Sequence, residues 1–216
     1  MGNLKIEWTV VSNCATNCYM CYNDETMKGF IVDPGYSGDR IIAKTDKLGF
    51  TPEAVIITHA HYDHIAAAKY VAEHYNIPIW AGELEDKLLH DPVDNLSIDF
   101  GGEAVTLDAD RLLKDGEEIS VAGFKGRVIL TPGHTPGGIC VYFEEQKVLI
   151  SGDTLFCESV GRTDFPGGNT RQEVESIIYK LFTLPDDTVV YPGHMGTTTI
   201  GHEKKYNPCS GFVGRV

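Results

Sequence analysis

The sequence predicts an α+β fold in which β-sheets pack on each other and helices cover their outer faces. Helical patterns occur in the first and last thirds of the chain, and a series of short apolar runs lies between them. Short turns separate these runs, which favours antiparallel pairing of neighbouring strands. The 216 residues contain no internal repeat and no Pro-rich or Ser-rich linker, so we expect one domain over residues 1–216.

The first half of the chain alternates expected strands with expected helices. One helix begins at Ser37, where apolar residues recur on one face, and ends before Gly49. A second helix is expected over residues 65–75 and a short one over residues 84–89. The expected strands are residues 4–11, 18–22, 29–32, 54–57, 77–80 and 104–107.

The second half contains further short strands and one strong helical pattern. The helix follows Thr170, which together with Glu173 has the spacing of a capping box. Apolar residues recur at helical spacing after it, at Val174, Ile177, Ile178, Leu181 and Phe182. The expected strands are residues 118–121, 126–130, 138–143, 147–151 and 188–191.

Composition and charge exclude several classes of function. Lys and Arg total 18 against 31 Asp and Glu, and the formal net charge of −13 repels phosphate backbones and anionic lipids. We therefore expect neither nucleic acid nor a membrane as a partner. No apolar run approaches the roughly 18 residues of a membrane span. The first residues lack the pattern of a secretory leader, so we expect a cytoplasmic location.

The strongest chemical signal is a group of histidines and an aspartate between an apolar strand and a helix. His59, His61, Asp63 and His64 fall within six residues. Because alternate residues of an extended segment point to the same side, His59 and His61 can bind one metal ion, and a following turn can bring Asp63 and His64 around a second point. This spacing indicates a metal site with room for two ions.

Three more residues of the same chemical kind follow other strands. His134, Asp153 and His194 each come directly after a glycine, where the backbone can approach closely and turn a side chain towards a common centre. Together with the first four they form a set of seven, enough for two metal ions about 3.5 Å apart with open positions for water and substrate.

The sequence of residues 59–64, followed by His134, Asp153 and His194, resembles the metallo-β-lactamase superfamily, and the resemblance covers most of the chain. Shorter motifs resemble its glyoxalase II-like branch, the hydroxyacylglutathione hydrolases, and particularly the short form. These motifs are Asn17-Cys18-Tyr19, Asp33-Pro34-Gly35, Gly152-Asp153-Thr154-Leu155-Phe156 and the Gly-rich residues 161–168. The resemblance implies a four-layer αββα sandwich.

The resemblance also assigns a role to each predicted ligand. The first divalent metal would be bound by His59, His61 and His134, the second by Asp63, His64 and His194, and Asp153 would bridge them. Zn²⁺ is expected, and Fe²⁺ or Mn²⁺ fits the same histidine and carboxylate ligands. Asp63 is the expected catalytic residue as well, because its carboxylate can hold the proton of the attacking hydroxide.

A pair of such cations acidifies a shared water near neutral pH, and the hydroxide attacks a carbonyl carbon. The resemblance therefore implies a dinuclear hydrolase whose small-molecule partner is an acyl thioester such as S-lactoylglutathione. Two alternatives stay open: a persulfide dioxygenase-like oxidoreductase with one iron, and a lactone or β-lactam hydrolase. Metal counting and O₂ uptake separate the oxygenase from the hydrolases. An inactive binding module is disfavoured, because all seven ligand positions are filled.

The thiol part of the substrate stays open. Long hydroxyacylglutathione hydrolases add a C-terminal helical region whose basic residues hold the glutathione carboxylates, whereas 22 residues follow His194 here. The cations among them are Lys204, Lys205 and Arg215. The net charge does not decide the question, because two bound cations make the site less anionic than the residue count suggests.

The cysteines suggest a second kind of metal site. Cys14, Cys18 and Cys21 have the C-x3-C-x2-C spacing of a [4Fe–4S] cluster. Cys18 and Cys21 lie in an expected strand, however, where residues three apart face opposite sides, and we favour packing residues. Cys157, four residues after Asp153, is either a thiol near the site or a packed residue, and we favour the second reading.

The Gly-flanked loop around Arg162 has two readings. Arg162 either contacts substrate or supports the strand ends through a pair with a carboxylate. Since Arg forms bidentate ties that fix loops, we favour the supporting role.

Overall fold

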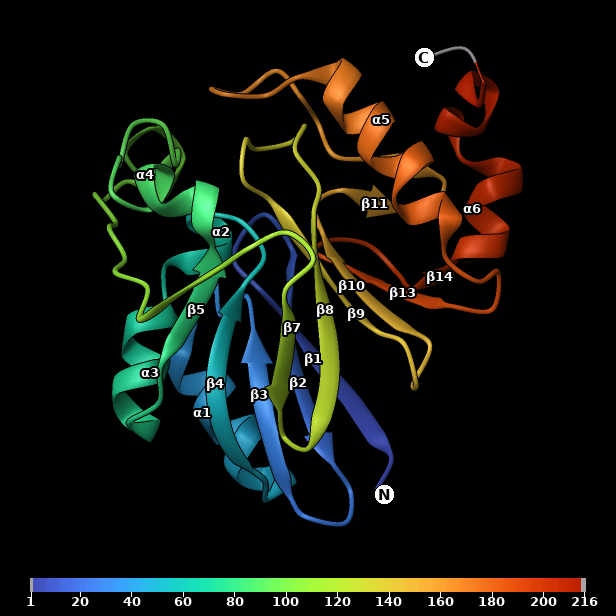
Figure 1. Cartoon of the computed structure of the whole chain (residues 1–216). Helices are drawn as coiled ribbons and strands as arrows, with labels where there is room; N and C mark the ends of the chain where they lie inside the picture. The colour runs from blue at the N-terminus through green and yellow to red at the C-terminus, as the bar shows by residue number, and fades with distance from the viewer. Residues whose placement is uncertain (1, 215–216) are drawn as a thin grey trace.

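Two six-stranded β-sheets lie face to face in the computed structural model, which describes residues 2–214 (Figure 1). In the first sheet the strands follow chain order, antiparallel from the first to the third and parallel from the third to the sixth. These strands are β1 (Leu4–Val11), β2 (Thr16–Asn23), β3 (Lys28–Val32), β4 (Thr51–Ile57), β5 (Ile79–Gly82) and β6 (Arg111–Leu113).

The second sheet has the order β14-β13-β10-β9-β8-β7. Its strands are β7 (Glu118–Val121), β8 (Phe124–Leu130), β9 (Ile139–Phe143), β10 (Val148–Gly152), β13 (Val189–Pro192) and β14 (Thr198–Thr199). Strands β7 to β10 pair antiparallel, as the short turns predicted, and β13 then lies parallel to β10. A small hairpin of β11 (Leu155–Phe156) and β12 (Ser159–Val160) forms a separate two-stranded sheet next to β10 and β13.

Helices cover the outer face of each sheet, so the four-layer αββα arrangement is confirmed (Figure 1). The first sheet is covered by α1 (Gly38–Leu48) and α3 (Ala68–Tyr75), and the second by α5 (Thr170–Tyr179), η3 (Leu181–Thr183) and α6 (Ile200–Tyr206). The shorter helical segments are α2 (Tyr62–Ile65), η1 (Glu83–Glu85), α4 (Asp86–Leu89), η2 (Ser97–Gly101) and η4 (Pro208–Phe212). Within residues 2–214 no helix has the length and apolar character needed to cross a membrane.

The alternation of side chains along each strand builds three apolar layers. In β9, Ile139, Val141 and Phe143 pack between the two sheets, whereas Cys140 and Tyr142 pack under the helices of the second sheet. The same period of two appears in the other central strands, because successive side chains of a strand point to opposite faces. A sheet buried on both faces therefore needs strands that are apolar at nearly every position, and all residues of β9 and β10 are buried.

The topology brings the carboxyl ends of four strands to one edge of the sandwich. Strands β8, β10 and β13 run in the same direction in the second sheet, and β4 of the first sheet ends opposite them. Backbone hydrogen bonds join the two sheets at this edge: Ile139 N–H donates to the Thr58 carbonyl at 2.9 Å, and Asn17 N–H to the Gly193 carbonyl at 2.7 Å. The residues that follow the four strands therefore meet at one place.

Three sequence-based expectations are corrected. The expected helix over residues 65–75 begins earlier, at Tyr62, and is interrupted between α2 and α3. Residues 104–107 are not a strand, because side chains use the backbone groups of Val105. Its N–H donates to the Ser97 hydroxyl, and its carbonyl accepts from Asn95 Nδ2. The edge strand that pairs with β5 is β6, a few residues later.

The third correction concerns the start of α5. The N-cap is Asn169, whose side chain accepts from the Gln172 N–H at 3.0 Å, and not Thr170. Glu173 does not close a capping box, because its carboxylate accepts a hydrogen bond from a different part of the chain, the His134 N–H at 2.9 Å. The helix itself lies where the pattern predicts it.

Candidate metal centre

All seven predicted ligands meet at the edge where the strands end. Their ligand atoms form overlapping groups, and within each group these atoms lie within 4.8 Å of one another. The groups are His59 with His61 and His134, His59 with His64 and Asp153, and Asp63 with His64 and His194. The first and the third correspond to the two ligand sets that the resemblance implies. Six of the seven residues are buried, and His194 is partly exposed.

Asp153 lies between the two sets. Its Oδ2 is 3.6 Å from His134 Nε2 and 3.2 Å from His194 Nε2, and its Oδ1 is 3.4 Å from His64 Nε2. Four ligand atoms around a tetrahedral zinc, each about 2.0–2.1 Å from the ion, are themselves about 3.3 Å apart. The separations around Asp153 are of that size, so one carboxylate reaches both sets.

Hydrogen bonds at the Nδ1 atoms of His59 and His64 leave their Nε2 atoms free to bind a metal ion. The Asp33 carboxylate accepts from His64 Nδ1 at 3.0 Å and from the Thr58 hydroxyl at 2.6 Å. Since the Thr58 hydroxyl proton is used there, its oxygen accepts from His59 Nδ1 at 3.2 Å. Such outer contacts fix the ring tautomer and orientation of metal-binding histidines.

His134 is held from both its side chain and its backbone. Its Nδ1 donates to the Arg162 carbonyl oxygen at 2.7 Å, which leaves Nε2 with a lone pair facing the cluster. Its backbone N–H donates to Glu173 at 2.9 Å. A second buried carboxylate, Glu85, accepts from Ala60 N–H and Gly137 N–H, both at 2.7 Å, and so ties the His59–His61 segment to the loop after His134.

Unpartnered buried atoms test whether the residues fit metal ions. His59 Nε2 and Asp153 Oδ1 are buried and have no hydrogen-bond partner in residues 2–214, and His61 Nδ1 faces His134 Nε2 at 2.9 Å within the first ligand set. A buried polar atom without a partner costs about 1–3 kcal/mol, so native proteins rarely leave several together. Divalent cations would satisfy such lone pairs, and the His and Asp clusters are consistent with a dinuclear metal site.

Electrostatics keep four of the predicted ligands in the form that binds metal, whereas Asp153, against the effect of burial, raises the pKa of His64 to about 10 and raises that of His194. Burial lowers the pKa of His59, His61 and His134 below the usual range, and these rings are therefore neutral at pH 7. Burial alone would raise the pKa of Asp153, but the surrounding histidines, His64 foremost, hold it well below the usual range. A neutral imidazole and an ionised carboxylate are the forms that coordinate cations.

At two of the strand ends the backbone passes so close to neighbouring side chains that only glycine fits. Gly133 has φ of +152°, and a Cβ there would lie 2.2 Å from a carboxylate oxygen of Glu173. A Cβ on Gly193 would lie 2.1 Å from Asp153 Oδ1, a distance that real Cβ atoms do not show. The glycines that precede the ligands thus let the chain pass close to the cluster.

Several supporting residues were not predicted as part of the site. Asp33 and Asn17 belong to motifs that carried the family resemblance, but the sequence assigned them no role. Asn17 Nδ2 donates to the Pro192 carbonyl at 3.0 Å and thus holds the turn before His194, and the Thr16 hydroxyl donates to Asp63 Oδ2 at 2.6 Å.

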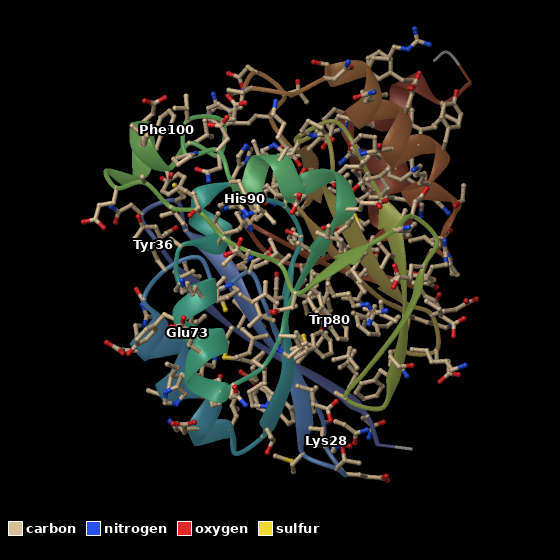
Figure 2. All side chains as sticks on the ribbon, turned by 60° about the vertical axis from the view of Figure 1, so that its left-hand side comes forward. Lys28, Tyr36, Glu73, Trp80, His90 and Phe100 are labelled. Carbon is tan, nitrogen blue, oxygen red and sulfur yellow. The ribbon has the colours of Figure 1, made fainter. Side chains whose placement is uncertain are left out.

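A pocket of about 380 Å³ opens above the cluster. The ligands His61, Asp63, His134, Asp153 and His194 contribute to its lining. Its other lining residues are Cys14, Tyr62, Leu96, Phe100, Phe156, Ser159, Val160, Arg162, Phe165 and Met195. Figure 2 shows Phe100 projecting from the loop at the top of the molecule, far from Lys28 at the opposite end. The volume lies in the range of small-molecule sites.

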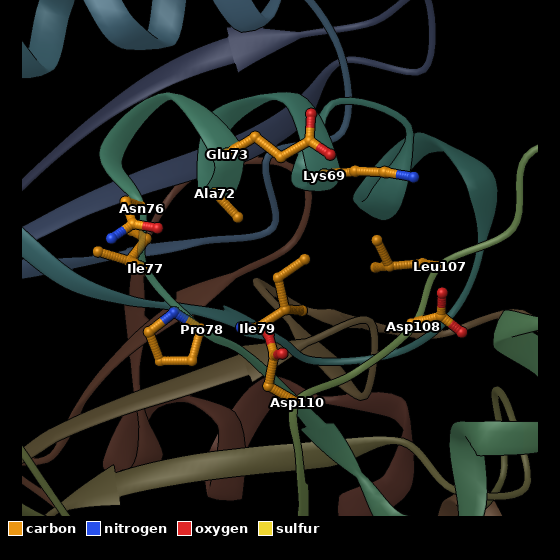
Figure 3. A pocket seen from close by; sticks show the side chains of 10 residues that line it. All are labelled: Lys69, Ala72, Glu73, Asn76, Ile77, Pro78, Ile79, Leu107, Asp108 and Asp110. Carbon is orange, nitrogen blue, oxygen red and sulfur yellow. Dashed lines mark hydrogen bonds between the residues drawn. The ribbon is translucent and has the colours of Figure 1, made fainter.

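Another hollow, of about 430 Å³, lies against α3 (Figure 3). Lys69 and Glu73 extend along one side of it, and Ile79, Leu107 and Asp108 lie on the opposite side. None of the seven predicted ligands lines this hollow. The chemistry of the cluster therefore belongs to the smaller pocket.

The cysteines do not form a cluster site. Cys18 packs under the helices of the first sheet and Cys21 packs between the sheets, so they face opposite sides of β2 as predicted. Cys14 is exposed in the loop before β2. Cys157 does not line the pocket and lies near His202 and Glu203.

Comparison with known proteins supplies the class. The family model described as "Metallo-beta-lactamase superfamily" matches residues 11–194, and the chain belongs to this superfamily. Hydroxyacylglutathione hydrolase GloC of Haemophilus influenzae is 36% identical over 209 residues, which cover 95% of this chain and 97% of that protein. Two further relatives are named as probable metallo-hydrolases. Together with its histidine clusters, this places the chain among the metallo-hydrolases of the superfamily.

Two solved structures agree with this class. The BLEG-1 B3 metallo-β-lactamase matches with a TM-score of 0.90 and 37% identity, covering 94% of this chain and 98% of that one. The protein TTHA1623, solved in a di-iron-bound form, matches with a TM-score of 0.82 and 31% identity over the same shares of the two chains.

Proposed function

We propose that this protein is a dinuclear metallo-hydrolase that cleaves small acyl thioesters, with chemistry like that of hydroxyacylglutathione hydrolase. The observation that carries the proposal is the shared position of Asp153 between two histidine-rich ligand sets at the floor of a small pocket. The likeness to the Haemophilus influenzae enzyme over nearly the whole chain supports the thioester as substrate. The metals would be Zn²⁺, with Fe²⁺ and Mn²⁺ compatible with the same ligands.

The residues would divide the work as follows. His59, His61 and His134 would hold one ion and Asp63, His64 and His194 the other, with Asp153 between them. When bound, the two ions supply acidified water and a Lewis acid for the carbonyl group of the substrate.

Asp63 is the proposed catalytic residue. It lines the pocket, and its Oδ2 lies 3.5 Å from His194 Nε2. The Thr16 hydroxyl donates to the same oxygen and so fixes the direction of the carboxylate. From this position the carboxylate can accept the proton of the attacking water and orient its lone pair towards the acyl carbon.

The test is hydrolysis by the purified protein after metal content has been measured. Loaded protein is offered acyl thioesters, lactones, a chromogenic β-lactam and glutathione persulfide. We expect two metals per chain and release of free thiol from thioesters, with loss of activity on chelation and recovery on reloading. Turnover of the β-lactam alone, or one iron per chain with O₂ uptake on the persulfide, would replace the proposal with one of the two alternatives.

A further inference from the structure

A second group of metal-binding residue types lies outside the pocket. Cys157, His202 and Glu203 each offer one ligand atom, and these three atoms lie within 4.8 Å of one another. None of the three residues lines the pocket. Cys157 lies in the turn of the β11–β12 hairpin, and the other two belong to α6, so two segments far apart in the sequence meet here (Figure 1).

Glu203 is a fully buried carboxylate. Its Oε2 accepts from two N–H groups, both at 2.9 Å, whereas the one hydrogen bond found for its Oε1 within residues 2–214 comes from the Thr198 hydroxyl at 2.6 Å. The next residue, Lys204, pairs with Asp186 instead. Buried charges are usually paired with another charge or bound to a metal ion. Since a carboxylate oxygen has two lone pairs, Oε1 keeps one for a cation.

The other two residues reach the same point from the solvent side. Cys157 is a free and partly exposed thiol. His202 Nε2 lies 3.0 Å from Oε1 of Glu158, the residue that follows Cys157, and both side chains of this pair are open to solvent. Exposed pairs of this kind contribute little to stability, so an ion can replace the contact. Glu158 also adds a second carboxylate beside the group.

We propose that Cys157, His202 and Glu203 bind a zinc ion in addition to the two expected at the pocket. Thiolate, imidazole and carboxylate are all zinc ligands, and a thiolate favours Zn²⁺ over Mg²⁺ and Ca²⁺. The thiol gives its proton to solvent when the Zn–S bond forms, and water takes the fourth tetrahedral position. The site fills when metal is added to the purified protein, because three ligands, two of them partly exposed, hold an ion less tightly than the buried sets of the pocket.

The ion holds one wall of the pocket in place without contacting a substrate. The hairpin residues around the turn, Phe156, Ser159 and Val160, line the pocket. The turn is already tied to α6 by the hydrogen bond from Glu158 N–H to Glu203. A zinc ion adds a second tie between the same two segments. This role is separate from the proposed thioesterase function and does not depend on it.

Cobalt is a spectroscopic probe for this site. A thiolate–Co²⁺ bond absorbs in the near ultraviolet, and none of the seven predicted pocket ligands is a thiol, so the band reports on the new site alone. We expect the full chain to gain this band in excess Co²⁺ and to lose it when Zn²⁺, which binds more tightly, is added. Because the readout is absorption and not hydrolysis, its failure leaves the proposed function untouched.

Two cysteine variants assign the band. Cys157→Ser should abolish it. Cys14→Ser, which changes the exposed thiol in the pocket lining, should keep it. Absence of the band from the parent chain, or a band that survives Cys157→Ser, would overturn the proposal.

Two histidine variants measure the affinity. Loss of an outer partner alone typically lowers metal affinity about 10–100-fold, so His202→Ala should weaken Co²⁺ binding at the thiolate by about 100-fold or more. His90→Ala is the matched control, because His90 also pairs with a surface carboxylate, Asp108 at 2.9 Å, and it should leave the affinity unchanged. Equal affinity in His202→Ala and the parent would show that His202 is not a ligand and that the three-residue site is wrong.

Discussion

Glu173, in the first turn of α5, accepts the backbone N–H of His134 at 2.9 Å. The carboxylate is buried, and burial raises its pKa to about 9, because an ionised oxygen there loses contact with water. The contact joins a helix of the outer layer to a predicted metal ligand. It therefore makes the position of His134 depend on the packing of α5.

Glu173→Ala should weaken both folding and metal binding. The His134 N–H would lose its buried acceptor, which costs about 1–3 kcal/mol in the free energy of unfolding. Loss of such outer contacts typically lowers metal affinity about 10–100-fold. Chemical denaturation and metal titration measure the two effects.

The control for Glu173 lies on the same helix. Glu175 pairs with Arg171 at the surface, so Glu175→Ala should change stability by about 0.5 kcal/mol or less and leave metal affinity unchanged. If both variants behave alike, the His134 contact does not position the ligand.

Variants at Asp153 and at His194 should differ in how many metal ions the protein retains. Asp153 reaches both ligand sets, whereas His194 belongs to one. We expect Asp153→Ala to lose most of both ions and His194→Ala to retain about one per chain. Elemental analysis of the purified variants measures this. Retention of the same number of ions by both variants would contradict a shared Asp153.

The gathering of the seven predicted ligands could be predicted from the sequence because each lies in a local signal. His59, His61 and His64 are close in sequence, and His134 follows a strand and a glycine. Strand ends of the same direction meet at one sheet edge, so short-range patterns were enough to predict that they gather.

The supporting carboxylates could not be predicted in the same way. Glu85 and Glu173 lie 25 and 39 residues from the backbone groups that they bind, Ala60 N–H and His134 N–H. Glu173 also matched a local capping box, and that local interpretation was wrong because a buried long-range donor uses its carboxylate. The expected strand at residues 104–107 failed for a similar reason, since side chains of a neighbouring loop use its backbone groups.

Arg162→Ala should leave the metal centre intact. The carbonyl oxygen that His134 contacts belongs to the backbone and is kept in alanine. The Arg162 and Asp164 side chains are 58% and 67% exposed, so stability should fall by less than about 1 kcal/mol. KM for a neutral thioester should stay within about twofold. An increased KM with unchanged metal content and stability would show that the guanidinium contacts substrate and does not merely support the loop.

Glu53 should contribute to stability in a pH-dependent way. Its carboxylate accepts from Lys28 and from the Ala122 N–H, at 2.7 and 2.9 Å, and Lys28 foremost holds its pKa below the usual value. A carboxyl group with a lowered pKa in the folded state stabilises it above the unfolded pKa, and this contribution is lost as pH falls through the folded value.

The Glu53 variant is tested by denaturation at several pH values. Glu53→Gln should be less stable than the parent by about 1 kcal/mol or less at pH 7, because the pair is partly exposed. The difference should shrink below the ordinary Glu pKa of about 4.3. A difference that is constant from pH 7 to pH 3 would mean that the charge of Glu53 contributes nothing.

Gly193→Ala should damage the metal centre although it changes no ligand. The added Cβ would lie 2.1 Å from Asp153 Oδ1 and 2.8 Å from His64 Cε1, so the turn, the carboxylate or the ring must move. Since both side chains face the space between the two ligand sets, we expect loss of metal and of thioesterase activity in a protein that still folds. Gly196→Ala is the matched control three residues later, where a Cβ meets nothing within 4 Å. Circular dichroism, elemental analysis and thioester hydrolysis compare the two variants. Full metal content in Gly193→Ala would mean that the strand end can shift without cost and that close approach at this glycine is not required.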